Sequence, residues 1–158
     1  MLPRRDHIEA DQTGGNGQAM DQKISLLGTV PLFAGLDRKD LEEIGRLCDE
    51  VDLPAERVIA RQGSSADAFY IILDGTVAIE RDGALLRDMG PGEFFGELAM
   101  VAKVPRTATA TSKTPTRLLV LGHAQFNGLM AEFPAIRICV LQALADRIST
   151  LQPNASTH

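Results

Sequence analysis

Gly96 and Arg106 are the residues of this chain whose types and positions best suit the binding of a small anion. Gly96 has no Cβ, so a ligand can approach its backbone closely, and the segment after it can open a helical turn whose first N–H groups lack intrahelical partners. The N-terminus of such a turn attracts negative charge. Pro105 ends the turn, and we expect residues 106–111 to form a strand that returns the Arg106 guanidinium to that N-terminus. Together these groups predict a phosphate site.

Glu97, directly after Gly96, adds a carboxylate that would repel a bare phosphate. A carboxylate is useful at this position only if it faces a hydroxyl group of the ligand. A phosphate next to a hydroxyl suggests a ribose phosphate. The simpler alternative is that Glu97 and Arg106 form an ion pair on an ordinary strand-helix-strand corner, since short motifs also match by chance.

The segments Phe-Gly-Glu-Leu-Ala at residues 95–99 and Pro-Arg-Thr-Ala-Thr at residues 105–109 place Glu97 and Arg106 nine positions apart. This combination resembles the phosphate-binding cassette of cyclic nucleotide-binding domains, which occur in cyclic-nucleotide-dependent kinases, gated channels and the catabolite activator family of bacterial regulators. The resemblance implies that Arg106 pairs with the cyclic phosphate and that Glu97 accepts a hydrogen bond from the ribose 2′-hydroxyl. It also implies that the cradle is completed by backbone N–H groups around Gly96, Leu98, Ala99 and Thr107.

The residue after the arginine bears on the choice of base. In the family, a small apolar residue there is associated with adenine, whereas a hydroxyl can hydrogen-bond a syn guanine. Thr107 carries a hydroxyl, but bacterial and channel members with a hydroxyl at this place also favour adenine. We therefore expect cyclic AMP as the ligand, with cyclic GMP as the alternative.

The resemblance implies a regulatory module that binds a cyclic nucleotide and transmits its occupancy through the terminal helices to an effector protein. One alternative is an interaction domain that keeps the fold without useful nucleotide binding. We expect no enzyme, because hydrolysis of a cyclic phosphate would need metal ligands or an activated nucleophile, and the cassette supplies neither. A transcription factor of the catabolite activator type needs a helix-turn-helix after the last long helix, where only residues 152–158 remain, so we expect no direct contact with nucleic acid.

Helical segments are expected on the N-terminal side of the site. Residues 24–36 resemble the beginning of the family domain, in which a short helix and a Pro-Leu-Phe turn precede a longer helix. Asp37 is a suitable N-cap for that longer helix, and Asp40 adds negative charge to its first turn. One face of the helix is apolar, since four residues recur at helical spacing: Leu41, Ile44, Leu47 and Cys48.

The middle of the chain reads as β-structure. From residue 51 to about residue 120, short β-rich runs alternate with turn residues, which predicts an antiparallel sandwich or jelly roll. The pairs Asp74-Gly75 and Asp82-Gly83 are flanked by β-forming residues and predict hairpin turns. We expect Phe94 and Phe95 to anchor a core. The predicted fold class is α+β: an antiparallel β-roll (double-stranded jelly roll) flanked by N-terminal and C-terminal helices.

The C-terminal region is again helical, with a short helix at residues 124–130 and a longer one at residues 135–151, separated by Phe133-Pro134. The longer helix carries an apolar stripe that suits either core packing or a homodimer seam: Ile136, Val140, Leu144, Ile148 and Leu151. In the family these helices move on binding and often cap the base. The adjoining face offers three candidates for that cap: Arg137, Leu141 and Ala145.

Length and composition bound the organisation of the chain. The 158 residues, 44% of them hydrophobic, suit one domain, which we place at residues 21–151. We expect a disordered leader at residues 1–20, where a polar, glycine-rich stretch has little to bury, and a flexible tail at residues 152–158. No apolar run approaches the roughly 18 residues of a membrane helix, and residues 1–6 lack a signal-peptide core. We therefore expect a cytoplasmic protein without membrane insertion.

Charge and cysteine content narrow the partners further. The net charge of −5 does not favour nucleic acid or an acidic membrane, so an anionic ligand must be held locally. Cys48 and Cys139 fall on predicted helix faces, where we expect each thiol to pack as a small apolar group without a disulfide. The three histidines lie far apart, so we expect no metal ion and no cofactor beside the nucleotide ligand.

Overall fold

The computed structural model describes residues 16–65, 68–96 and 104–151. Within these residues the chain forms four α-helices, one 3₁₀ turn and eight strands. The helical elements are α1 (Asn16–Gly28), η2 (Pro31–Phe33), α2 (Arg38–Leu47), α4 (His123–Glu132) and α5 (Pro134–Leu151). The strands are β1 (Asp49–Leu53), β2 (Val58–Ala60), β3 (Ala68–Asp74), β4 (Val77–Arg81), β5 (Ala84–Met89), β6 (Phe94–Phe95), β7 (Thr109–Ser112) and β8 (Thr116–Gly122).

Helices α1 and α2, joined through η2, form the predicted N-terminal helical unit, but the expected order of a short helix before a longer one is wrong, because α1 has 13 residues and α2 has 10. Asp37 is the N-cap of α2, where its side chain accepts a hydrogen bond of 2.9 Å from the Asp40 amide. At the other end of α2, the Lys23 ammonium donates to the carbonyl oxygens of Gly45 and Cys48, each at 2.6 Å. These bonds satisfy groups that a helix end otherwise leaves without partners. Helix α1 begins at Asn16, within the segment 1–20 that we expected to be a leader.

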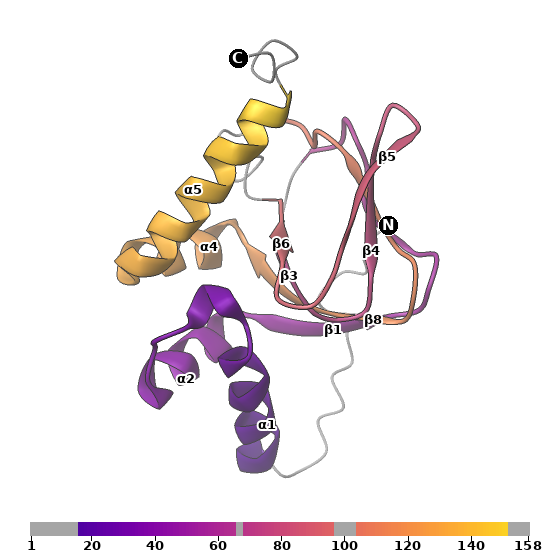
Figure 1. The fold of residues 1–158 in the computed structure, drawn as a ribbon. Helices are drawn as coiled ribbons and strands as arrows, with labels where there is room; N and C mark the ends of the chain where they lie inside the picture. The colour runs from indigo at the N-terminus through magenta and orange to yellow at the C-terminus, as the bar shows by residue number, and fades with distance from the viewer. Residues whose placement is uncertain (1–15, 66–67, 97–103, 152–158) are drawn as a thin grey trace.

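The strands form two four-stranded antiparallel sheets, and Figure 1 shows how they lie beside the helices. One sheet has the order β1-β8-β3-β6 and the other has the order β2-β7-β4-β5. The fold is therefore the α+β jelly-roll arrangement that the sequence predicts, with the two sheets facing each other and the helices packed on the outside of the first sheet.

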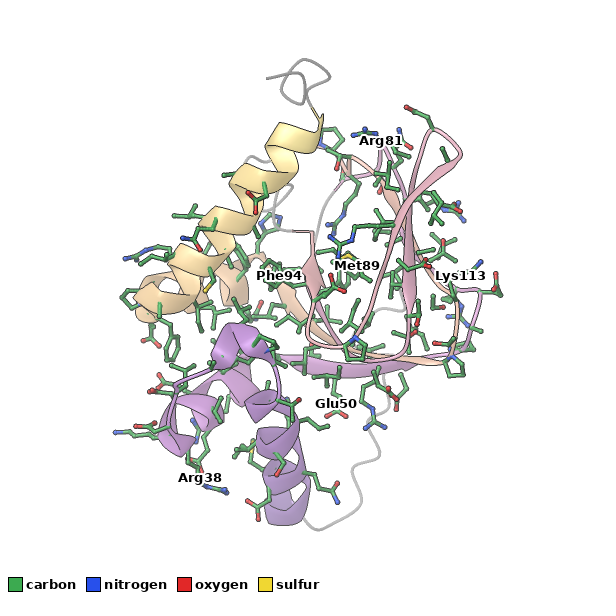
Figure 2. The ribbon with its side chains drawn as sticks, viewed as in Figure 1. Arg38, Glu50, Arg81, Met89, Phe94 and Lys113 are labelled. Carbon is green, nitrogen blue, oxygen red and sulfur yellow. The ribbon has the colours of Figure 1, made fainter. Side chains whose placement is uncertain are left out.

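The β1-β8-β3-β6 sheet is buried on both faces because its side chains alternate between two apolar clusters. The helix-side cluster joins this sheet to buried residues of the helices, and the sheet contributes Phe69, Ile71, Leu119 and Leu121. The interior cluster fills the space between the two sheets, and this sheet contributes Tyr70, Ile72, Leu118 and Val120. As predicted, Phe95 belongs to a core, while Phe94 is partly buried against the helix-side cluster. In Figure 2, Met89 and Phe94 lie in the interior of the domain, between its helices and strands. Arg38, Glu50 and Lys113 lie at the outer edge of the domain in the same view.

One of the two predicted hairpins is confirmed and the other is wrong. Strands β4 and β5 pair across Asp82 and Gly83, whose φ angles of 54° and 81° suit a tight hairpin turn. Asp74-Gly75 instead carries the chain from one sheet to the other, because β3 and β4 belong to different sheets. Gly75 has a φ of 98°, and a Cβ there would lie 2.5 Å from the Pro115 carbonyl oxygen. Its glycine therefore serves a crossover that is packed against the turn before β8.

The C-terminal stripe packs within the chain itself. Ile136 and Val140 of α5 are fully buried in the helix-side cluster, and Leu144 is also buried. The side chains of Ile148 and Leu151 are outside the described part of the structure. Of the two readings of this stripe, core packing holds for the three residues that the structure describes.

The two cysteines differ in their surroundings. Cys48 is buried in the helix-side cluster, as predicted, and burial raises the pKa of its thiol to about 12. Cys139 is exposed on α5, so the prediction that it packs as an apolar group is wrong. Residue 139 lies at the edge of the stripe that buries Ile136 and Val140, and its side chain is exposed there.

Candidate functional site

Arg106 lies in an extended segment before β7, and its backbone is bonded to the loop between β2 and β3. The Gly63 amide donates to the Arg106 carbonyl oxygen at 2.8 Å, and the Arg106 amide donates to the Ser64 carbonyl oxygen at 2.9 Å. We expected a strand over residues 106–111, but β7 begins only at Thr109. The backbone of Arg106 pairs with this loop, so regular sheet pairing starts three residues later.

The guanidinium of Arg106 is held inside the domain. The residue is only 6% exposed, and its Nη2 donates a hydrogen bond of 2.7 Å to the carbonyl oxygen of Ala68 at the start of β3. Its Cζ atom lies 5.4 Å from the centroid of the Tyr70 ring. A cation kept in this position in a chain of net charge −5 is well suited to an anion.

Gly96 lies directly against this guanidinium. Its φ is 97°, a conformation that favours glycine, and a Cβ on it would lie 2.8 Å from Arg106 Nη1 and 3.1 Å from the Ala68 carbonyl oxygen. We expected a glycine here so that a ligand could approach the backbone. The structure shows that the same absence of a Cβ gives the arginine side chain its place.

The structure brings together two of the six residues predicted for the site, Gly96 and Arg106. Thr107 follows Arg106 and is half-buried. Glu97, Leu98 and Ala99 lie outside the described residues.

Sequence reasoning missed the groups that seat the arginine. Ala68 and Tyr70 of β3 contact its guanidinium, and Gly63 and Ser64 hold its backbone. Strand alternation places Tyr70 on the opposite face from Phe69 and Ile71, which is a signal that Tyr70 faces the interior. Nothing in the local sequence identifies Ala68, because it contributes only its carbonyl oxygen.

The three candidates for a base cap, Arg137, Leu141 and Ala145, are exposed on α5. Arg137 Nη1 donates to the Met130 carbonyl oxygen of α4 at 3.2 Å. This bond ties the beginning of α5 to the end of α4.

Among the side chains of the described ranges, no group of three or more His, Cys, Asp or Glu residues is placed to hold a metal ion. In the same part of the chain no single helix is long and apolar enough to cross a membrane. Only the helix pair His123–Glu132 and Pro134–Asp146 has the length and apolar composition of a span when the two are taken together, and this pair is bent by 116°.

Comparison with known proteins gives a consistent result. A family described as cyclic nucleotide-binding domain matches residues 50–133. A cyclic nucleotide-gated potassium channel of Mesorhizobium japonicum is 36% identical over 111 residues, which cover 70% of this chain and 31% of the channel. A CRP-like cAMP-activated global transcriptional regulator of Mycobacterium tuberculosis is 31% identical over 134 residues, which cover 82% of this chain and 60% of the regulator.

A solved structure agrees with these relatives. The catabolite activator protein of Thermus thermophilus matches with a TM-score of 0.69 and 28% sequence identity, covering 77% of this chain and 59% of that one. This chain therefore spans between 31% and 60% of the length of the three proteins.

Proposed function

The chain belongs to the cyclic nucleotide-binding domain family, and on that premise we propose that it binds cyclic AMP in preference to cyclic GMP and regulates a partner protein through its terminal helices. The observation that carries the proposal is the buried guanidinium of Arg106, seated against Gly96. A monoanionic cyclic phosphate would match this cation in charge, and charge-assisted bonds from arginine are among the strongest in proteins.

The remaining roles follow the resemblance. We propose that Glu97 accepts a hydrogen bond from the ribose 2′-hydroxyl. Backbone N–H groups around Gly96, Leu98, Ala99 and Thr107 would complete the phosphate cradle. The preference for cyclic AMP is supported by the similarity to a regulator described as cAMP-activated. The hydroxyl of Thr107 keeps cyclic GMP as the alternative ligand.

The contacts of strand β3 support the proposal that binding of the nucleotide is transmitted to the helices. Tyr70 faces Arg106, whereas the preceding residue, Phe69, faces the helix-side cluster and contacts Phe126 of α4 at a centroid distance of 5.0 Å. A ligand regulates through such a path only if it binds one arrangement of the helices more tightly than another. The relatives span much more sequence than this chain, so we propose that the regulated activity belongs to an effector outside the region described here and that this domain catalyses no reaction.

A homodimer contact through α5 is a further part of the proposal. The stripe with Ile136 and Val140 is used inside the domain, so the contact would use the outer side of α5, where Ile138 is 55% exposed and Leu141 is 47% exposed. Single exposed apolar residues are common, but two of them three positions apart on a helix form a continuous apolar surface.

Isothermal titration with cyclic AMP, cyclic GMP and linear AMP tests the ligand. We expect heat with cyclic AMP, weaker binding of cyclic GMP and the weakest binding of linear AMP. Arg106→Ala is expected to cost about 2–5 kcal/mol of binding free energy, as for the loss of one partner of a buried charge pair. The matched control is Arg117→Ala, which removes an exposed guanidinium that pairs with Asp52 at 2.8 Å.

Two results would contradict the proposal. Undiminished binding by Arg106→Ala would remove the assigned role of the arginine. Absence of heat with all three nucleotides for the unmodified chain would favour the interaction domain that keeps the fold without useful nucleotide binding.

A further inference from the structure

Tyr70 lies on strand β3 with its ring facing the guanidinium of Arg106. The distance from Arg106 Cζ to the ring centroid is 5.4 Å, within the range of a cation–π contact. Tyr70 is 1% exposed, so both partners are shielded from water, where such contacts are strongest.

The ring of Tyr70 is also held by a neighbour on the paired strand β6. Tyr70 pairs with Phe95 in the β3–β6 register, and the two rings stack with centroids 4.9 Å apart and planes at 26°. A ring fixed by a cross-strand neighbour offers the guanidinium one orientation. The hydrogen bond from Nη2 to Ala68, two residues earlier on β3, gives a second fixed point.

The chemistry of an aromatic face differs from that of a carboxylate beside the same cation. A carboxylate would also stabilise the arginine, but it would compete with phosphate for the N–H groups of the guanidinium. A ring attracts the positive charge through its quadrupole and carries no second negative charge. It therefore helps to hold a buried guanidinium without itself competing with an anion.

We propose that Tyr70 is a positioning residue for ligand binding, whose ring face holds the Arg106 guanidinium in the direction that meets the nucleotide phosphate. This inference rests on the proposed function, because the direction of Arg106 matters only if it binds the phosphate. It adds a residue outside the cassette to the machinery of the site.

Titration with cyclic AMP distinguishes the contribution of the Tyr70 ring to affinity from that of its hydroxyl and from a general effect of core packing. Tyr70→Leu should raise the Kd about tenfold, and Tyr70→Phe should stay within about twofold of the unmodified chain, which corresponds to about 1.4 and 0.4 kcal/mol. The packing control is Ile72→Ala, two residues further along β3 in the same interior cluster. It should change the Kd less than about twofold although it also loses thermal stability.

Equal losses in Tyr70→Phe and Tyr70→Leu would assign the effect to the hydroxyl and overturn the role of the ring. A loss in Ile72→Ala as large as that in Tyr70→Leu would overturn the inference as well, since it would be a packing effect. If the unmodified chain binds none of the nucleotides, the proposed function fails, and the inference fails with it.

A spectroscopic test does not depend on binding. The sequence contains one tyrosine, so 3-fluorotyrosine labelling places a single ¹⁹F resonance at Tyr70. We expect Arg106→Gln to move this resonance without nucleotide, because the ring loses the cation at its face, and Arg117→Gln to leave it in place. A resonance that stays in place in Arg106→Gln would overturn the inference, even where the unmodified chain binds cyclic AMP.

Discussion

The ring of Phe69 on β3 lies 5.0 Å from the ring of Phe126 on α4, centroid to centroid, and 5.5 Å from the ring of Phe94 on β6. The next residue, Tyr70, lies against Arg106 on the other face of the same strand. Consecutive residues of a strand point to opposite faces, so a shift of β3 acts on the arginine and on the helix at once. Strand β3 therefore joins the proposed ligand site to the proposed output.

Phe69→Leu tests this connection. The substitution keeps an apolar side chain but removes the ring contact with Phe126, and we expect cyclic AMP affinity to change less than about threefold. The change in amide hydrogen exchange of residues 123–132 on adding cyclic AMP should shrink. The affinity is measured by titration and the amide exchange by hydrogen-exchange mass spectrometry, on the same samples.

The control for Phe69→Leu is Phe33→Leu, a fully buried ring of the helix-side cluster in η2. It loses a comparable amount of buried surface on the N-terminal side of the domain. The nucleotide-dependent exchange of residues 123–132 should persist in this variant. If Phe69→Leu retains the full exchange response, coupling through the Phe69 ring is refuted.

Gly96→Ala should impair binding through the arginine. A Cβ at position 96 would meet Arg106 Nη1 at 2.8 Å and displace the guanidinium from its place. We expect the Kd for cyclic AMP to rise at least about tenfold. The matched control is Gly35→Ala, because Gly35 has a similar φ of 87° but no atom within 4 Å of a Cβ.

Both glycine variants carry the backbone strain of a non-glycine residue at positive φ, about 1–2 kcal/mol. Only Gly96→Ala adds the contact with Arg106. Equal affinities of the two variants for cyclic AMP would show that the guanidinium relocates without loss of function.

The value of the sequence for predicting this molecule depended on how local each signal was. The Asp37 cap and the Asp82-Gly83 hairpin were predictable because neighbouring residues determine them. Asp74-Gly75 carries the same hairpin signal, but Gly75 is packed against Pro115, forty positions away, and leads into the other sheet. A local pattern contains no information on that contact.

The same distinction applies to the site. Gly96 and Arg106 were found from a motif of contiguous residues, and the structure places them against each other. Ala68 and Tyr70 come from a strand more than thirty positions before Arg106, and one of them acts through its backbone. Their roles depend on the pairing of β3 with β6, which brings Tyr70 opposite Phe95.

Because the Cys48 thiol is buried, we expect the folded protein to lose stability at alkaline pH. Burial raises the pKa of its thiol from 9.0 to about 12, so the folded state keeps this proton after the unfolded state has lost it. The stabilisation is fully present below pH 9 and is lost as the pH rises towards 12, at up to about 1.4 kcal/mol per pH unit. Denaturant unfolding between pH 8 and pH 11 should show a shallower decline for Cys48→Ala than for the unmodified chain.

The control for this pH dependence is Cys139→Ser, since Cys139 is exposed. Its stability should decline with pH as steeply as that of the unmodified chain. Thiol alkylation under native conditions should modify Cys139 and spare Cys48. Parallel pH profiles for Cys48→Ala and the unmodified chain would contradict the assignment of the decline to Cys48.

Because the outer side of α5 exposes apolar side chains, we expect the protein to self-associate weakly. Ile138 and Leu141 are 55% and 47% exposed, and one helical side with two large apolar residues is much smaller than the roughly 800 Å² per partner of a stable interface. We therefore expect a dimer that forms only at high protein concentration in sedimentation velocity. Ile138→Glu should abolish it by placing a charge in the contact, whereas Gln142→Glu, at an exposed position of the same helix, adds the same charge and should weaken it less. A sedimentation coefficient that is independent of concentration for the unmodified chain would exclude α5 as a homodimer contact and leave its outer side to the effector protein.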